Sequence, residues 1–166
     1  MGDFRQVKGS RLGSVIALLG AIALSLACAR PALAQPMLVE TLTTAENTQP
    51  IQIAADHIAA WENTGQQIML LRGNVVVTQD ALSVRMPSAV VWVDLARYQR
   101  DRVFHLVIYG EESIRIEGKS ASQANAGYVR MATTSRVDTS SYQSKIVRSD
   151  QSADQGYQRA VANRPA

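Results

Sequence analysis

The hydrophobic residues of this chain fall in short runs, and the pattern of residues 70–94 is that of β-strands. Residues 82–86 alternate apolar and polar side chains, and this period of two is typical of a strand with one buried face. Two neighbouring stretches, residues 75–77 and 89–93, are apolar at every position. Such runs must bury both faces of a strand or contact an apolar ligand. The pattern predicts a sheet around which the rest of the chain is organised.

Further short strands are predicted on both sides of this segment. They cover residues 51–61, 67–71, 103–109, 113–117 and 128–131. Residues 95–102 are polar and charged and are expected to form a loop, and residues 110–112 are expected to form a turn or bulge. Taken alone, Gly73 and Asn74 indicate a two-residue hairpin.

The first 34 residues have the pattern of a secretory signal peptide. Basic residues up to Arg11 precede an apolar run over residues 12–27, and residues 32–34 place small side chains at the two positions that a signal peptidase reads. We therefore expect export and cleavage after Ala34. Lipidation at Cys28 is the alternative. Cleavage after Ala34 removes this cysteine, the only one in the chain, and leaves no thiol for disulfide, metal or redox chemistry.

The exported part is expected to contain one domain between two polar flanks. Residues 35–50 are Thr-rich, with prolines near both ends, and are predicted to be a flexible lead-in. Residues 51–138 hold the predicted strands and form one domain of ordinary size. Residues 139–166 are rich in Ser, Gln and Asp and are predicted to be disordered. Brief strand pairing by residues 145–147 is the alternative within this tail.

The charge of the chain argues against nucleic-acid binding. The full chain carries a formal net charge of +3, but four of its 17 basic residues and one of its 14 acidic residues precede Gln35, which leaves 13 of each. A nucleic-acid footprint needs Lys and Arg clustered on one face. Because the basic excess belongs to the segment expected to be removed, we expect no nucleic-acid partner.

The sequence contains no recognisable catalytic or metal-binding pattern. His57 and His105 are the only histidines, and neither has Cys, His or Asp at ligand spacing. There is no Gly-x-Ser-x-Gly elbow and no phosphate loop. Glu111 and Glu112 suggest a paired-carboxylate site, but adjacent residues on a strand point to opposite faces, and we expect a solvated turn instead. We expect a protein that is not an enzyme and that carries no cofactor or metal.

A short internal repeat supports a fold of stacked strands. Residues 53–61 align without gaps with residues 84–92, and Trp61 and Trp92 fall at matching positions. Repeated short strands at this spacing are typical of a stacked sheet, a jelly roll or a solenoid. The two tryptophans are expected to pack at the rim or in the core.

Three segments carry a resemblance to a known family. Residues 73–79 (GNVVVTQ), 82–86 (LSVRM) and 89–92 (AVVW) resemble the OstA-like domain of periplasmic lipopolysaccharide-transport proteins, found in LptA and at the N-terminus of LptD. That family carries a Gly-Asn-Val segment, often followed by Thr-Gln, and an Ala-Asp element that Ala55 and Asp56 match. The equivalent step in the second copy of the repeat is Pro-Ser, a departure from the family pattern. The resemblance covers roughly residues 51–131.

The resemblance implies an all-β fold, an antiparallel jelly roll of stacked strands that is open along one side. In such a fold, Gly73 and Asn74 form a corner within a long strand. It also implies a non-enzymatic periplasmic module that binds lipopolysaccharide or a related lipid, with acyl chains inside and sugar head groups in water. Its partners would be other envelope transport proteins, or a second copy of itself, joined by β-strand addition. A β-repeat structural scaffold of the cell envelope is the alternative.

Two groups of residues are candidates for lipid contact. The candidate apolar lining consists of strand residues, namely Val75, Val77, Leu82, Val84, Met86, Val91, Ile114 and Ile116. Each buried acyl methylene contributes about 0.8 kcal/mol, and ordinary core packing is the alternative for each of these side chains. Arg97, Arg100 and Arg102 form a basic cluster suited to lipid phosphates at the mouth of a groove. A solvated loop is the alternative for this cluster.

Overall fold

The computed structural model describes residues 38–118 and 121–164, and the expected signal peptide, residues 1–34, lies outside them. The described residues all belong to one compact unit. Its strands are β1 (Leu38–Thr41), β2 (Ile51–Ala55), β3 (His57–Asn63), β4 (Gln66–Gln79), β5 (Leu82–Asp94), β6 (Phe104–Glu117), β7 (Ser122–Thr133) and β8 (Val137–Ser141), and its helices are α1 (Leu95–Asp101) and α2 (Gln155–Ala162). Neither of these described helices is long and apolar enough to cross a membrane.

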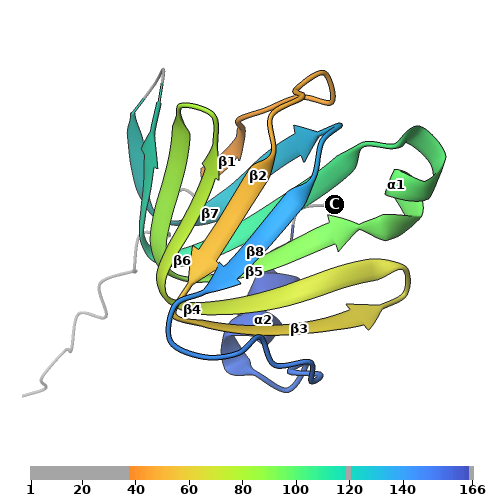
Figure 1. Ribbon diagram of the computed structural model, residues 1–166. Coiled ribbons are helices and arrows are strands. Elements are labelled where there is room, and N and C mark those ends of the chain that lie inside the picture. The colour runs from red at the N-terminus through yellow and green to blue at the C-terminus, as the bar shows by residue number, and fades with distance from the viewer. Residues whose placement is uncertain (1–37, 119–120, 165–166) are drawn as a thin grey trace, which may run out of the picture. The chain divides into compact units, whose positions relative to one another are not determined.

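The predicted all-β fold is confirmed, and it is a jelly-roll-like sheet that does not close. The strand order is β1-β7-β6-β5-β4-β2-β8, with β3 beside β4 (Figure 1). The central pairings are antiparallel, as expected. The outer pairs β1–β7 and β2–β8 are parallel instead, because each joins segments far apart in the chain rather than the two arms of a hairpin.

Three long strands, β4, β5 and β6, bend together and divide the sheet into two halves. The ladder register shifts at residues 72–75 of β4, 85–88 of β5 and 111–114 of β6. Before its bend β4 pairs with β3, and after its bend it pairs with β2. In Figure 1, β2 and β8 run side by side across the strands of the other half. The inner faces of the two halves bury one apolar cluster between them.

The bend of β4 has a clear cause in its residues. Gly73 and Asn74 have φ angles of 73° and 46°, a left-handed conformation that Gly and Asn adopt most readily. A Cβ atom on Gly73 would lie 2.5 Å from a carboxylate oxygen of Asp56, and Asn74 Nδ2 donates a hydrogen bond of 2.8 Å to Asp56 Oδ2. The predicted corner within a long strand is therefore confirmed, and the two-residue hairpin is not formed.

The N-terminal part of the domain is not a flexible lead-in over its described residues. β1 pairs with β7 from Leu38 to Thr41. The Thr43 hydroxyl accepts a hydrogen bond from Ala132 N at 2.9 Å. The prediction of a flexible lead-in was wrong for residues 38–50. Their hydrogen-bond partners in β7 lie about ninety residues away in the chain, and local composition carries no information about such partners.

The segment expected to be a disordered tail is also structured through Arg164. β8 pairs with β2, Val147 forms a parallel bridge with Ala59, and α2 packs on the outer face of the sheet. The disorder prediction was wrong because it relied on the polar composition of the whole segment, which does not show the few apolar residues that pack. Tyr157 and Ala160, which lie at helical spacing, are the two residues of α2 that are buried, and they give the helix one face that packs on the sheet.

Residues 95–102 form a helix rather than the expected loop. Asp94 is the N-cap of α1 and accepts a hydrogen bond from the backbone N–H of Arg97 at 2.8 Å. Arg102 ends the helix with φ 57°. An Asp at the N-cap is a sequence signal for a helix start. The loop prediction overlooked this signal because it relied on the polar composition of the segment.

Candidate functional site

The candidate apolar lining residues lie together on the inner face of the bent sheet. Seven of them, Val75, Val77, Val84, Met86, Val91, Ile114 and Ile116, belong to the buried inner cluster, and Leu82 is partly buried against it. The alternation of apolar and polar residues in the sequence therefore identified side chains that share one face of β4, β5 and β6. In this structure the neighbours of these side chains are other apolar side chains of the same cluster, so the layer is packed.

A buried amide lies at one end of this inner layer. Gln79 is 2% exposed, and its Nε2 donates to the carbonyl oxygens of Gln49 at 2.9 Å and Ala132 at 3.1 Å. Its Oε1 is buried without a hydrogen-bond partner. The side chain thus ties the end of β4 to the segment before β2 and to the end of β7. This tie holds the two halves of the sheet together by side-chain contacts.

The basic cluster proposed for head groups lies on α1 and just after it. Arg97 Nε donates to Asp101 Oδ2 at 3.2 Å, and the guanidinium of Arg102 lies 5.8 Å from the centroid of the Tyr98 ring. Arg100 is exposed. Because α1 connects β5 to β6 at the ends away from the bend, the cluster is remote from the bend. Its contact with lipid phosphates stays a prediction.

The outer face of the sheet carries a second apolar cluster, which is aromatic and covered by α2. Its strand residues include Trp61, Trp92, Tyr109 and Tyr128. Tyr157 of α2 reaches this surface, with its ring centroid 5.3 Å from that of Trp61 and 6.3 Å from that of Trp92. The Tyr128 hydroxyl donates a hydrogen bond to the carbonyl oxygen of Ala160. We call this set, with α2, the outer aromatic cluster.

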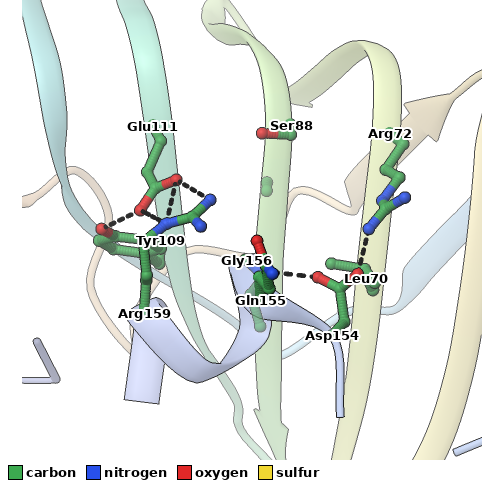
Figure 2. A pocket seen from close by; sticks show the side chains of 11 residues that line it. Leu70, Arg72, Ser88, Tyr109, Glu111, Asp154, Gln155, Gly156 and Arg159 are labelled. Carbon is green, nitrogen blue, oxygen red and sulfur yellow. Dashed lines mark hydrogen bonds and ion pairs between the residues drawn. The ribbon is translucent and has the colours of Figure 1, made fainter. Parts of the chain in front are cut away.

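A cavity of about 340 Å³ lies between the start of α2 and β4, β5 and β6 (Figure 2). An ion pair stands on each side of it. Arg72 pairs with Asp154, the N-cap residue of α2. Arg159 forms a two-pronged pair with Glu111, with Nε to Oε1 at 3.0 Å and a terminal nitrogen to Oε2 at 2.8 Å. The two pairs clamp α2 to the sheet.

The clamps change the protonation behaviour of their carboxylates. The hydrogen bond from Arg159 lowers the pKa of Glu111, although burial opposes it. Burial raises the pKa of Asp154, but the backbone N–H of Tyr157 and the charge of Arg72 outweigh it, and the net shift is downward. Burial raises the pKa of Tyr109 to about 12, helped by its hydrogen bond to Glu111. Both carboxylates are therefore held in the charged form at neutral pH.

Sequence analysis considered Glu111 only beside Glu112 and did not predict either ion pair. Glu111 and Arg159 are 48 residues apart, and Arg72 and Asp154 are 82 residues apart. The available signal was the N-cap residue Asp154 three positions before Tyr157, which is weak in a polar tail.

The described residues contain no group of three or more His, Cys, Asp or Glu placed to hold a metal ion. His57 Nδ1 lies 3.1 Å from Ser144 Oγ, and burial lowers the pKa of His105. The two histidines lie on different strands, β3 and β6. Comparisons of the chain with protein-family models, with curated proteins and with solved structures found no match.

Proposed function

We propose that this chain is a periplasmic module that binds lipopolysaccharide or a related lipid and passes it between envelope transport proteins. The observation that carries the proposal is the inner layer, which is apolar throughout and lies between two halves of a sheet that does not close. The acyl chains occupy this layer and the sugar head groups stay in water. No chemical step is part of the proposal.

Lipid entry requires the two halves to separate, because side chains fill the layer. The halves are continuous through the bends of the long strands, where Gly73 and Asn74 already have positive φ angles. Elsewhere they are held by packing and by bonds such as those of Gln79. Each buried acyl methylene supplies about 0.8 kcal/mol, so one long chain offsets the loss of several side-chain contacts.

Strand addition is the proposed mode of contact with partners. Among the described residues, β1 pairs only with β7, so the backbone groups on its other edge are open to a further strand. β1 has four residues. An edge strand this short limits uncontrolled aggregation, and the main-chain hydrogen bonds of an added strand would supply the affinity for a partner. The partner is another envelope transport protein or a second copy of this chain.

A structural scaffold of the cell envelope is the second candidate. The packing of the inner layer favours it, since none of the seven buried lining candidates is more than 5% exposed. A sheet with a filled interior needs no ligand to be stable.

Native mass spectrometry of residues 35–166, the expected mature chain, with and without lipopolysaccharide separates the two candidates. The transport module is expected to carry one lipid per chain at micromolar protein, and a scaffold carries none. To locate the lipid, Ile116→Ala opens a cavity in the inner layer and lowers the free energy of unfolding by about 2–5 kcal/mol. Because an acyl chain refills that cavity, lipid should raise the melting temperature of this variant more than that of the parent.

Val161→Ala is the matched control, because Val161 is 45% exposed on α2. The milder Ile116→Val replaces Ile116→Ala if the latter does not fold. An equal thermal shift in parent, interior variant and control places the lipid outside the inner layer and contradicts the proposal.

A further inference from the structure

The outer side of the bend carries a hollow of about 540 Å³ that the proposed function does not use. Val76 and Pro87 form the apolar part of its lining, which also includes Arg85, Arg115 and part of Met86. Arg85 and Arg115 are exposed, whereas Met86 belongs to the buried inner cluster. The hollow therefore combines an apolar wall with two cations.

The two arginines stand directly opposite each other on neighbouring strands. Arg85 of β5 is the Cα partner of Arg115 of β6, so their Cβ atoms are roughly 5 Å apart on one face. Like charges in this position destabilise a sheet. An anion bound between the two guanidinium groups would offset this repulsion.

Acidic residues near the hollow compensate this charge only in part. Glu117 Oε2 lies 3.8 Å from Arg85 Nε, and the two side chains are 59% and 58% exposed, so the pair is weak. Arg115 forms no ion pair within the part of the chain that the structure describes. The carboxylate of Asp56 near this site accepts the amide hydrogen bond of Asn74.

We propose that this hollow binds a phosphate monoester carried on an apolar group. Two guanidinium groups on adjacent strands offer several N–H donors to one tetrahedral anion, and the apolar wall contacts the first carbons of the ester. The phosphate anion itself is common to a lipid head group and to free phosphate, whereas only the ester also contacts the apolar wall. The site lies on the outer face, so it does not depend on lipid entering the inner layer.

Calorimetric titration of residues 35–166, the expected mature chain, with inorganic phosphate and with dodecyl phosphate and dodecyl maltoside below their micelle concentrations tests the proposal. Dodecyl phosphate is expected to bind. Arg85→Gln and Arg115→Gln should each weaken it about tenfold, the effect of losing one charged hydrogen-bonding group. Glu117→Gln should bind more tightly, because it removes the competing carboxylate.

The matched control is Arg100→Gln, an exposed arginine of α1, which should bind like the parent. Ile116→Ala should also bind like the parent, and this separates the result from the lipid site proposed for the inner layer. Comparable binding of inorganic phosphate identifies free phosphate as the ligand, whereas binding of dodecyl phosphate alone identifies a lipid head group.

Three results overturn the proposal. They are equal binding of dodecyl maltoside, parental affinity in the Arg85→Gln/Arg115→Gln double variant, and absence of binding by both phosphates. Removing one of two opposed cations should leave the melting temperature unchanged or raise it, so loss of binding will not reflect unfolding. Arg115→Lys keeps the positive charge but loses the planar guanidinium group with its paired N–H donors. Its affinity for dodecyl phosphate should fall between those of the parent and Arg115→Gln.

Discussion

The inner layer and the outer aromatic cluster are apolar surfaces on opposite faces of the same strands, but they are covered in different ways. The bent sheet covers the inner layer with its own second half, joined through continuous strands and ladder hydrogen bonds. The outer cluster is covered by α2, of which only Tyr157 and Ala160 are buried. The inner layer is thus part of the cooperative fold, whereas the outer cover is an attachment that can open locally.

We expect the largest loss of stability on mutation in the inner layer. Leu71→Ala removes a fully buried side chain from β4 and should lower the free energy of unfolding by about 2–5 kcal/mol. Urea unfolding followed by far-ultraviolet circular dichroism measures this loss for the whole sheet. A loss below about 1 kcal/mol, the range of ordinary surface changes, would show that the layer relaxes freely around the cavity.

The outer cover should respond to mutation separately from the sheet. Tyr157→Ala removes the ring that contacts Trp61 and Trp92, and it should detach α2 while leaving the strands folded. Both tryptophans of the chain lie in the outer aromatic cluster, so tryptophan fluorescence reports this face and circular dichroism reports the sheet.

The fluorescence maximum of Tyr157→Ala should move to longer wavelength in native buffer, with little change in the strand signal. Proteolysis between Tyr142 and Asp154 should become faster for the same reason. Val161→Ala, on the exposed side of α2, is the control and should leave both unchanged. Simultaneous loss of both signals would mean that α2 belongs to the cooperative unit.

The contrast between the two surfaces also explains what sequence analysis could reach. Strands of the inner layer were predicted because alternation is a local signal. The internal repeat was informative as well, because its two copies flank β4. Ile53 and Val84 both pair with Val77, and Trp61 and Trp92 both pair with Ile68.

The outer cover and the hollow at the bend could not be found in the same way. The clamps of α2 join residues far apart in the chain, and composition describes each side chain without its partner. From sequence, Arg85 and Arg115 are polar positions on two separate strands. Only the strand register of the structure shows that they lie opposite each other. Local pattern thus predicts elements and faces, whereas partners require the register and the folded chain.

A smaller effect is expected at Gln79, which joins the two halves at one end of the inner layer. Gln79→Ala removes hydrogen bonds to Gln49 and Ala132 and leaves their carbonyl groups without this donor. The expected loss is about 1 kcal/mol, and amide exchange should rise first in β2 and at the end of β7. Gln52→Ala, at an exposed position of β2, is the control. Uniformly faster exchange over all strands would argue against a local tie.

The smallest effect is a pH dependence confined to the outer cover. The folded-state pKa values of Glu111 and Asp154 are lowered. Their contribution is therefore complete above the unfolded values of about 4 and is lost as the pH falls through the folded values. Both pairs are partly exposed and screened by solvent, so each contributes modestly. On acidification, tryptophan fluorescence should change at a higher pH than the strand signal does.

Glu111→Gln with Asp154→Asn should remove this early step, since neither amide titrates, and Asn is as good an N-cap as Asp. Asp138→Asn is the matched control, because Asp138 pairs with Arg136 on the surface away from α2, and it should keep the early step. If the double variant retains the step, the two ion pairs do not hold α2. In that case, only Tyr157 and its aromatic contacts hold α2 on the sheet. The tryptophan fluorescence of Tyr157→Ala should then stay constant from neutral pH down to the pH at which the sheet unfolds.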